Sequence, residues 1–547
     1  MGRQKLFIHP NKNQLMKKLI TLITAFSIGV SAFAGGLLTN TNQSVHFLRN
    51  PAQDASTDID AAYSNPAGLI YLTDGFHFSL TNQSAFQTRT VTSTFAPFAA
   101  YGGNATKVYT AKTEALLIPS FQAAYKKDKL ALSASFAIIG GGGEATFANG
   151  LPSFEAPVSL IPMGLTAAGV HTTNYSMEQY LNGKQFIFGF QVNGTYKFNE
   201  IISGSLGVRI NYLTGSYDGY LRNIQINPQH PSLNPSGNMM QANTFFTNAA
   251  AAATGASSSL DPVVAGGFGS MTMSQLVSAG ALSAAQVSAL GAGLGTNVSN
   301  YTANQVQGGY KAAAASYTAN AAKTADKEVD CKQTGWGVTP ILGLDIHPSD
   351  NLLIGLKYEF GTKLNVTNNT RVDNTGLYPD GEVNRNDIPA LLTIGAQYTL
   401  DKVKISGGYH HFYDTEAKLP KDRQNSINSG INEYLLGAEY SINKTFLISA
   451  GGQLTRTGVT DDYQKDMSYS LNSFSIGVGG AVNLTKQLRL NVAYFFTKYD
   501  KWNKVVDKDH VFDPVANTKG YNGTSLGGTD VYDRTNNVIG VGLDYNF

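Results

Sequence analysis

The feature that most constrains this chain is a series of fourteen segments in which apolar and polar residues alternate, from Gly75 to the C-terminal Phe547. In the last segment Ile539, Val541 and Leu543 share one face, and glycines lie between them. A period of two residues is that of a β-strand. A sheet that spans a bilayer must pair every backbone polar group, so it has to close into a barrel. The pattern therefore predicts an all-β transmembrane protein, an antiparallel barrel of about fourteen strands.

The connections between these segments indicate the orientation of the barrel. Bacterial barrels alternate short periplasmic turns with longer outer loops, and the connections here switch in the same way. The largest outer loops are expected at about 140–183 and 218–334. The expected strands lie at about 75–86, 115–125, 129–139, 186–196, 203–217, 335–346, 351–362, 388–400, 403–412, 432–442, 445–455, 472–484, 487–499 and 537–547.

A soluble β-sandwich also has alternating strands, and the N-terminal part of the chain disfavours that alternative. From Met16 the chain has two lysines, an apolar run at 19–30 and an Ala-Phe-Ala sequence before Gly35, which is the pattern of a secretory signal peptide. The run is too short to cross a bilayer of about 30 Å as a retained helix. Residues 1–34 are therefore expected to be an upstream extension with a signal peptide.

The amino-acid composition and the absence of known motifs exclude several classes of function. Only 14% of the residues are charged, against about 25% in an average soluble domain. The chain has no basic stripe that would suggest nucleic acid, and its single cysteine, Cys331, cannot form an intramolecular disulfide. It also lacks the Gly-x-Ser-x-Gly, P-loop and His-Glu-x-x-His patterns. We therefore expect no enzyme activity, no cofactor and no metal, and no nucleic acid partner.

Residues 35–72 are the candidate hatch, a plug for the lumen. Fourteen strands enclose a lumen that wall side chains alone do not fill, so water or a plug must occupy it. This segment precedes the first strand of the barrel at 73–547, and it ends in Asn65-Pro66-Ala67-Gly68, which favours a tight turn. A disordered periplasmic tail is the alternative, which the many apolar residues of the segment disfavour.

The central part of the loop at 218–334 is almost free of charge, since Asp261 is the one acidic or basic residue between Arg222 and Lys311. Two short helices are expected within 271–290, with Ser283 as an N-cap. Uncharged apolar loops at the barrel mouth mark an interaction site. The alternative is that the outer loops pack on each other and cap the barrel.

Candidate ligand contacts are apolar residues of the hatch and of the first large loop, together with two cations expected to face the lumen. They are Phe47, Leu48, Leu151, Phe154, Leu160, Ile161, Met163, Arg209 and Lys357. Arg209 or Lys357 can pair with a ligand carboxylate. The alternative is that both belong to an ion-pair network that holds the hatch.

The chain resembles the FadL/TodX type of outer-membrane transporters for long-chain fatty acids and other hydrophobic compounds. The resemblance covers the whole mature chain. It is carried by the Asn-Pro-Ala-Gly-Leu turn at 65–69, the second strand with Ile118-Pro119, and the later motifs at 355–358, 387–389 and 434–440. It implies a monomeric barrel in the outer membrane, surrounded by lipid and lipopolysaccharide and plugged by an N-terminal hatch.

The resemblance also implies passive uptake of a hydrophobic small molecule, with capture by the outer loops and release through a lateral opening at a kink in the third strand. The glycine run Gly140, Gly141, Gly142 and Gly143 is the candidate for that kink, because glycine adopts backbone angles that other residues avoid. The start of an ordinary flexible loop is the alternative. A general porin for small hydrophilic solutes is the competing function, and a barrel-embedded lipase is a more distant one.

Overall fold

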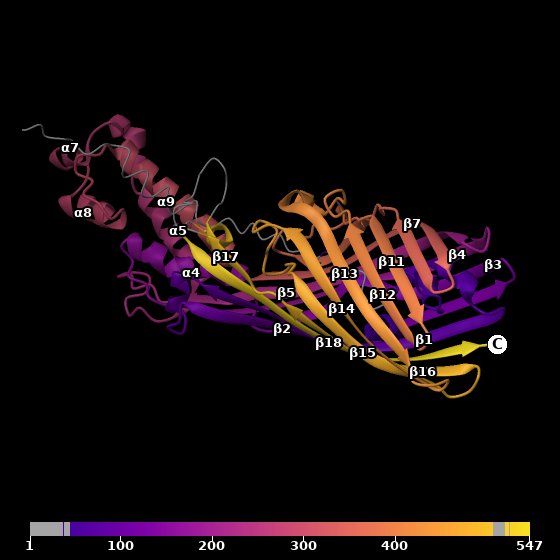
Figure 1. Ribbon diagram of the computed structural model, residues 1–547. Helices are drawn as coiled ribbons and strands as arrows, with labels where there is room; N and C mark the ends of the chain where they lie inside the picture. Colours follow the sequence, from indigo (N-terminus) through magenta and orange to yellow (C-terminus); the bar gives the residue numbers. More distant parts are fainter. Residues whose placement is uncertain (1–36, 38–43, 507–519, 525) are drawn as a thin grey trace, which may run out of the picture.

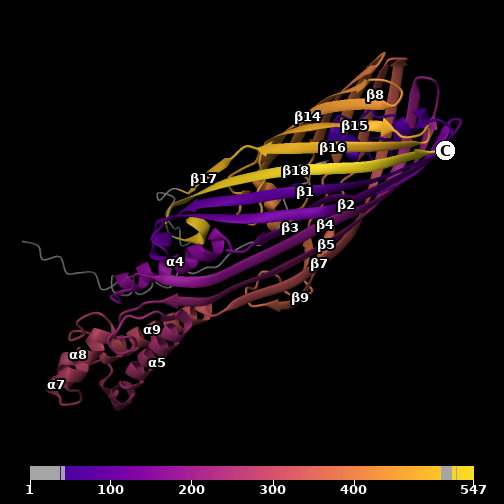
Figure 2. The same cartoon turned by 90° about the horizontal axis from the view of Figure 1, so that it is seen from below.

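The computed structural model describes residue 37 and residues 44–506, 520–524 and 526–547. The expected signal peptide at 1–34 lies outside the described residues. Fourteen long antiparallel strands form the wall (Figures 1 and 2). They are β1 (Gly75–Thr94), β2 (Thr106–Lys127), β3 (Leu130–Phe147), β4 (Tyr175–Lys197), β5 (Ile202–Ile226), β7 (Lys327–Ser349), β8 (Leu352–Glu359), β11 (Leu391–Leu400), β12 (Val403–Phe412), β13 (Ile427–Ser441), β14 (Phe446–Val459), β15 (Ser473–Asn483), β16 (Leu488–Tyr499) and β18 (Gly528–Asn546).

The wall closes on itself. β1 pairs with β2 on one side and with β18 on the other, and β18 pairs with β16, so the first and last strands leave no free edge. The predicted barrel of fourteen antiparallel strands is therefore confirmed. Four short strands extend the sheet further, namely β6 (Met240–Gln241), β9 (Asn365–Asp373), β10 (Val383–Arg385) and β17 (Trp502–Val506).

The two faces of the wall differ as the alternation predicts. Large apolar side chains such as Leu117, Leu206 and Trp336 are exposed on the outside, whereas the inward positions of the same strands carry buried polar residues. A closed barrel with an apolar outer band is the architecture of an outer-membrane protein. None of the described helices is long and apolar enough to cross a bilayer.

The strands extend farther outward than the sequence indicates. β3 reaches Phe147 and β4 begins at Tyr175, so the ends of the expected loop at 140–183 are strand. The expected loop at 218–334 likewise contains the end of β5 and the start of β7. Apolar and polar residues alternate in the part of a strand whose outer face contacts lipid. Beyond the bilayer the ladder continues without that pattern, because both faces can be polar.

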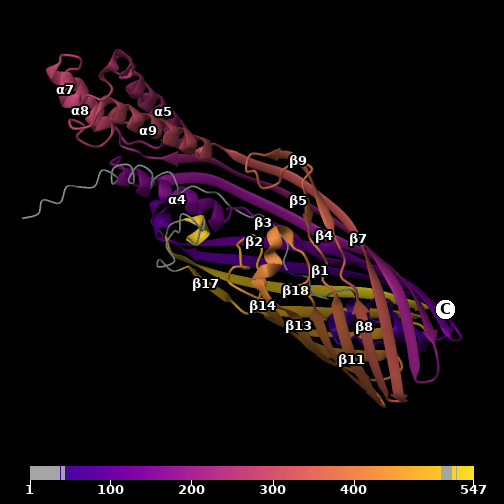
Figure 3. The same ribbon diagram turned by 90° about the horizontal axis from the view of Figure 1, so that it is seen from above.

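Helices gather at the outer end of the barrel, opposite the C-terminus (Figures 1 and 3). Both Ser283 and Thr302 form capping boxes at helix starts, which confirms the predicted N-cap at Ser283. The outer helices are α4 (Pro152–Ala167), α5 (Ala242–Ser258), α6 (Asp261–Val263), α7 (Met273–Ser278), α8 (Ala284–Gly293) and α9 (Ala303–Thr324), with η2 (Ala96–Ala100), η3 (Val264–Phe268), η4 (Pro420–Ser426) and η5 (Tyr521–Gly523) in the outer connections.

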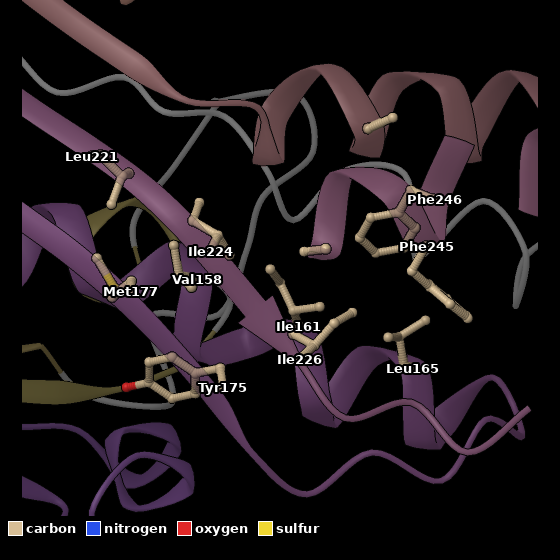
Figure 4. Close-up of a cluster of buried hydrophobic side chains, with 12 residues drawn as sticks. Val158, Ile161, Leu165, Tyr175, Met177, Leu221, Ile224, Ile226, Phe245 and Phe246 are labelled. Carbon is tan, nitrogen blue, oxygen red and sulfur yellow. The ribbon is translucent and has the colours of Figure 1, made fainter. Parts of the chain in front are cut away.

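An apolar cluster joins these helices to the extended strands (Figure 4). Val158, Ile161 and Leu165 of α4 meet side chains of β4 and β5, and Phe245 and Phe246 of α5 pack against the same cluster. The outer helices are therefore fixed to the barrel wall by a hydrophobic core of their own.

Candidate functional site

The N-terminal segment 44–72 lies inside the barrel, where it forms α2 (Val45–Arg49), α3 (Ala61–Ser64) and η1 (Pro66–Tyr71). We call this segment the hatch. Asn65 begins η1, since its side-chain oxygen accepts a hydrogen bond from the Ala67 amide at 3.3 Å. Thr195 of β4 donates to the Pro66 carbonyl at 2.7 Å, and Ser203 of β5 donates to the Ala67 carbonyl at 3.1 Å. The predicted Asn-Pro-Ala-Gly turn is thus bound directly to the wall.

Buried polar pairs connect the hatch to strands all around the barrel. His410 of β12 lies 2.8 Å from Asp54 of the hatch and 2.9 Å from Glu433 of β13. A second buried pair joins the hatch to the last strand, where His46 lies 3.0 Å from Asp544 of β18. Among the described residues no group of three or more histidine, cysteine, aspartate and glutamate side chains could hold a metal. His410 links the hatch to β13 through these two contacts, which its sequence context does not reveal.

Glycines in the wall allow the hatch backbone to lie directly against the strands. A Cβ added to Gly355 would stand 2.2 Å from the Asp54 carbonyl oxygen, and one on Gly477 would stand 2.1 Å from the Leu48 carbonyl oxygen. At Gly437 the nearest atom would be the Asn50 side-chain oxygen, at 1.9 Å. A larger residue at Gly355 or Gly477 would displace the hatch backbone, and one at Gly437 would force the Asn50 side chain to move.

The predicted cations Arg209 and Lys357 both lie in one ion-pair network between the wall and Tyr63 of the hatch. Glu359 accepts from Lys357 at 2.7 Å and also pairs with Arg209. The Lys357 ammonium donates to the Tyr63 carbonyl at 3.3 Å, and the Arg209 guanidinium lies 5.4 Å from the centroid of the Tyr63 ring. This arrangement is the network that holds the hatch. Ligand binding by the two cations stays a prediction.

The predicted apolar hatch residues face the wall. Phe47 and Leu48 belong to a buried cluster with side chains of β13, β16 and β18, and the rings of Phe47 and Phe495 are 5.9 Å apart. Phe47 also borders a small cavity of about 20 Å³ together with Tyr63 and Gln122. The structure places these residues at the contact between plug and wall.

One stretch of the wall lacks pairing between neighbouring strands. The β2–β3 ladder runs up to the pair Phe121–Phe136 and resumes at Lys112–Thr146, so the described residues of 113–120 and 137–145 form no ladder pairs with each other. We call this stretch the β2–β3 window. Exposed leucines at 116 and 117 lie on its β2 side.

The residues of the window explain why the backbones of β2 and β3 do not pair there. Pro119 of β2 has no N–H to donate. On β3, Gly141 and Gly143 have φ angles of +100° and +72°, which other residues rarely adopt. β3 carries two residues more than β4 between the pairs Ile138–Phe188 and Gly143–Gln185. The run Gly140 to Gly143 therefore lies within β3 as a double bulge, and its interpretation as the start of a flexible loop is wrong.

The hatch lines the inner side of the window. Tyr63 of α3 belongs to an apolar cluster with Ala137 and Ile139, which are β3 residues of the window. Ile187 of β4 and Leu213 of β5 complete this part of the cluster. The hatch residue that touches the ion-pair network is thus also the one beside the unpaired wall.

An apolar cavity of about 270 Å³ lies at the outer mouth, between α4, α9 and the extended strands. Its walls come from six separate parts of the chain, including Phe154, Val158, Leu221, Leu377 and Met467. Of the predicted contacts, only Phe154 lines it. The local sequence gives no signal for the others, because the cavity forms only when distant segments meet.

The remaining predicted loop contacts lie elsewhere. Leu151 is buried in the cluster beside Phe154. Leu160 packs in a different cluster with Phe95 and Phe98, Ile161 lies in the cluster of Figure 4, and Met163 is 48% exposed. The structure therefore does not bring the predicted apolar residues together in one groove.

A buried carboxylate anchors α4, the helix that lines this cavity. Glu155 accepts hydrogen bonds from the hydroxyls of Tyr109 and Tyr175, each at 2.7 Å, and it pairs with Lys107. We expect Glu155→Ala to destabilise α4 by about 3 kcal/mol, because it leaves buried donors unpaired. Faster amide hydrogen exchange at 152–167 would show this effect. Glu144→Ala, at an exposed ion pair with Lys184, serves as the control, and equal exchange in both variants would refute the anchoring role.

Comparisons with known proteins identify the fold of this chain through its similarity to solved structures. No protein-family model and no curated protein matches the chain. The crystal structure of a Pseudomonas aeruginosa FadL homologue is 11% identical, with a TM-score of 0.55, over 94% of this chain and 100% of that chain. The Pseudomonas putida toluene transporter TodX is 14% identical, with a TM-score of 0.48, over 94% and 99% of the two chains. The chain therefore has the fold of the FadL homologue over nearly its whole length.

Proposed function

We propose that this protein is a passive outer-membrane channel for hydrophobic molecules, with long-chain fatty acids as the first substrates to test. It acts as a monomer surrounded by lipid and lipopolysaccharide, without a cofactor or metal. The apolar mouth cavity supports capture from outside, since burying each methylene contributes about 0.8 kcal/mol. Release needs a second state of lower affinity, because a ligand shifts an equilibrium only through its differential binding to the two states.

The observation that supports this function best is the β2–β3 window beside a plugged lumen. The hatch lies inside the barrel, and buried pairs between its residues Arg49, Asp54 and Asn65 and the wall fix it there. A molecule that passes sideways through the window reaches the lipid-facing leucines at 116 and 117. Such an exit suits hydrophobic cargo and excludes ions and sugars, which disfavours a general porin. Movement of Tyr63 away from the window is the step that would open it.

Deleting Gly141 and Gly142 tests this route. The deletion removes the two residues that β3 carries in excess of β4, and it keeps the inward and outward alternation because two residues are one full strand period. We expect β3 to pair with β4 without its two bulges, which changes the path of β3 along the window, and uptake of a radiolabelled long-chain fatty acid by cells to fall to the level of cells without the protein.

The control is deletion of Gly102 and Gly103, two exposed glycines of an outer turn with φ angles of +79° and +76°. Both variants must reach the outer membrane in equal amounts and migrate as folded barrels in unheated gels. Full uptake by the variant without Gly141 and Gly142 would refute release through the window. Efflux of small hydrophilic solutes through the unaltered protein would favour the porin instead.

A further inference from the structure

The periplasmic end of the barrel, where the chain terminates (Figure 1), carries lysines on three successive turns. The turns join β11 to β12, β13 to β14 and β15 to β16, and they contain the exposed residues Lys402, Lys444 and Lys486. Among the residues that the structure describes, none of the three lysines lies within ion-pair distance of an acidic side chain. Elsewhere on the same rim a lysine does have an acidic partner, since Lys197 pairs with Glu200.

A cavity of about 500 Å³ lies beside these lysines. Lys402, Lys444 and Arg489 line it together with neutral residues, and no acidic residue of the described chain is part of its lining. Asp401, which precedes Lys402, is the one acidic residue in the three turns. This part of the rim therefore has an excess of positive charge.

Arg489 of β16 connects the cavity to the hatch. Its Nε donates a hydrogen bond to the Asn483 side-chain oxygen at 3.0 Å, and its ion pair with Asp58 of the hatch is 3.9 Å long. That distance is too long for a hydrogen bond, so the pair is loose. A planar guanidinium binds a carboxylate best through two short parallel hydrogen bonds. A second carboxylate in the cavity could bind Arg489 more closely than Asp58 does.

The cavity faces the interior of the barrel and not the lipid. The contact with Asp58 of the hatch places Arg489 on the lumen side of the wall. The neighbouring residues on the outer face are apolar, and Ile442 and Ile448 are exposed there. A molecule that enters the cavity therefore comes from the aqueous periplasm and not from the bilayer.

The spacing of the three lysines indicates the size of the partner. Neighbouring strands lie about 4.8 Å apart and successive turns on one rim are two strands apart, so the row of lysines is about 20 Å long. A phosphate ion or a single carboxylate is much shorter than this row. An extended peptide advances about 3.3 Å per residue, so about six residues would span it.

From this geometry we infer that Lys402, Lys444, Lys486 and Arg489 form a docking site for an acidic segment of a soluble periplasmic protein. Carboxylates of the segment pair with the lysines along the rim, and one of them enters the cavity and competes with Asp58 for Arg489. The inference goes beyond the proposed function, because it concerns a partner at the periplasmic end and holds for any cargo.

The probe for this site is a capped peptide of six glutamates between glycines, and its neutral counterpart has six glutamines. Binding to the full-length protein in phosphatidylcholine nanodiscs is measured by calorimetry at low ionic strength, because salt screens exposed charges. We expect the glutamate peptide alone to bind. The triple variant Lys402→Gln, Lys444→Gln, Lys486→Gln should bind it about tenfold more weakly, as for the loss of three exposed ion pairs.

The matched control removes three lysines from another part of the same rim. This variant is Lys127→Gln, Lys129→Gln, Lys197→Gln, which changes the net charge by the same amount. It is expected to bind the glutamate peptide as tightly as the unaltered protein does. Both triple variants should migrate as folded barrels in unheated gels.

Asp58→Asn tests the competition at Arg489. The substitution removes the carboxylate that the peptide has to displace, so the affinity for the glutamate peptide should rise about threefold. In an Arg489→Gln background the same substitution should have no effect, because nothing is left to compete for. Equal strengthening in both backgrounds would show an effect of net charge alone and would overturn the competition.

The other outcomes separate the docking site from its alternatives. Equal losses in the two triple variants, or no binding of the glutamate peptide to the unaltered protein, overturn the site. Full displacement of the peptide by inorganic phosphate at equal ionic strength assigns the cavity to small anions. Phosphatidylglycerol that the unaltered barrel retains during purification and the lysine variant loses assigns the lysines to lipid headgroups, and either assignment overturns peptide docking. Fatty acid uptake by cells remains the separate test of the proposed function.

Discussion

Gly355→Val is expected to turn the plugged barrel into one that conducts ions. The new side chain would occupy the space of the Asp54 carbonyl, which lies 2.2 Å from the position of a Cβ. Strand β8 is held by two neighbours, β7 and β11, whereas the hatch is held by dispersed side-chain contacts. The hatch is therefore the part that moves. Single-channel recordings in planar bilayers should show a large, steady conductance in the variant and very little in the unaltered protein.

Gly407→Val is the matched control for this experiment. It introduces the same side chain into β12, but a Cβ there would stand 3.8 Å from the nearest atom, the Leu435 carbonyl oxygen. The control is expected to remain closed to ions. If both variants are equally silent, the hatch does not depend on close approach to the wall glycines, and its placement as the plug fails.

Glu359→Gln is expected to lower the free energy of unfolding by about 3–5 kcal/mol, the range seen when one partner of a buried ion pair is removed. The substitution leaves Arg209 and Lys357 buried beside a neutral amide. Urea unfolding in detergent, followed by tryptophan fluorescence, measures the effect. The double variant Glu359→Gln, Lys357→Met should recover part of the loss, because it removes one of the two stranded charges.

The control for the ion-pair network is Glu200→Gln. Glu200 pairs with Lys197 at the periplasmic rim, where its side chain is 85% exposed, so the unfolding midpoint should not change. A midpoint for Glu359→Gln equal to that of the control would contradict the view that this network stabilises the hatch and wall together.

The barrel could be predicted from the sequence because lipid imposes a strict pattern on each strand. The hatch was predictable for a related reason, since apolar residues without a strand period before the first strand have to be buried somewhere. The outer ends of β3 and β5 were not predictable, because neither of their faces contacts lipid and the residues therefore need not alternate. The start of α8 at Ser283 was predictable, since a cap is a local signal.

The candidate site was less predictable than the fold. Arg209 and Lys357 were correctly placed on the lumen side, but their shared partner Glu359 fixes them to the hatch only through the tertiary structure. The mouth cavity depends on Leu221, Leu377 and other residues far apart in the chain, so no local pattern reveals it.

The β2–β3 window also has a mechanical consequence. In an intact cylinder each strand passes shear to both neighbours, so twisting force is spread around the whole circumference. A slot interrupts that transfer, and the load concentrates at its two corners, here the pairs Phe121–Phe136 and Lys112–Thr146. Torsion applied by the outer helices or by membrane tension would therefore deform the wall first at this slot, while the long β1–β18 seam stays rigid.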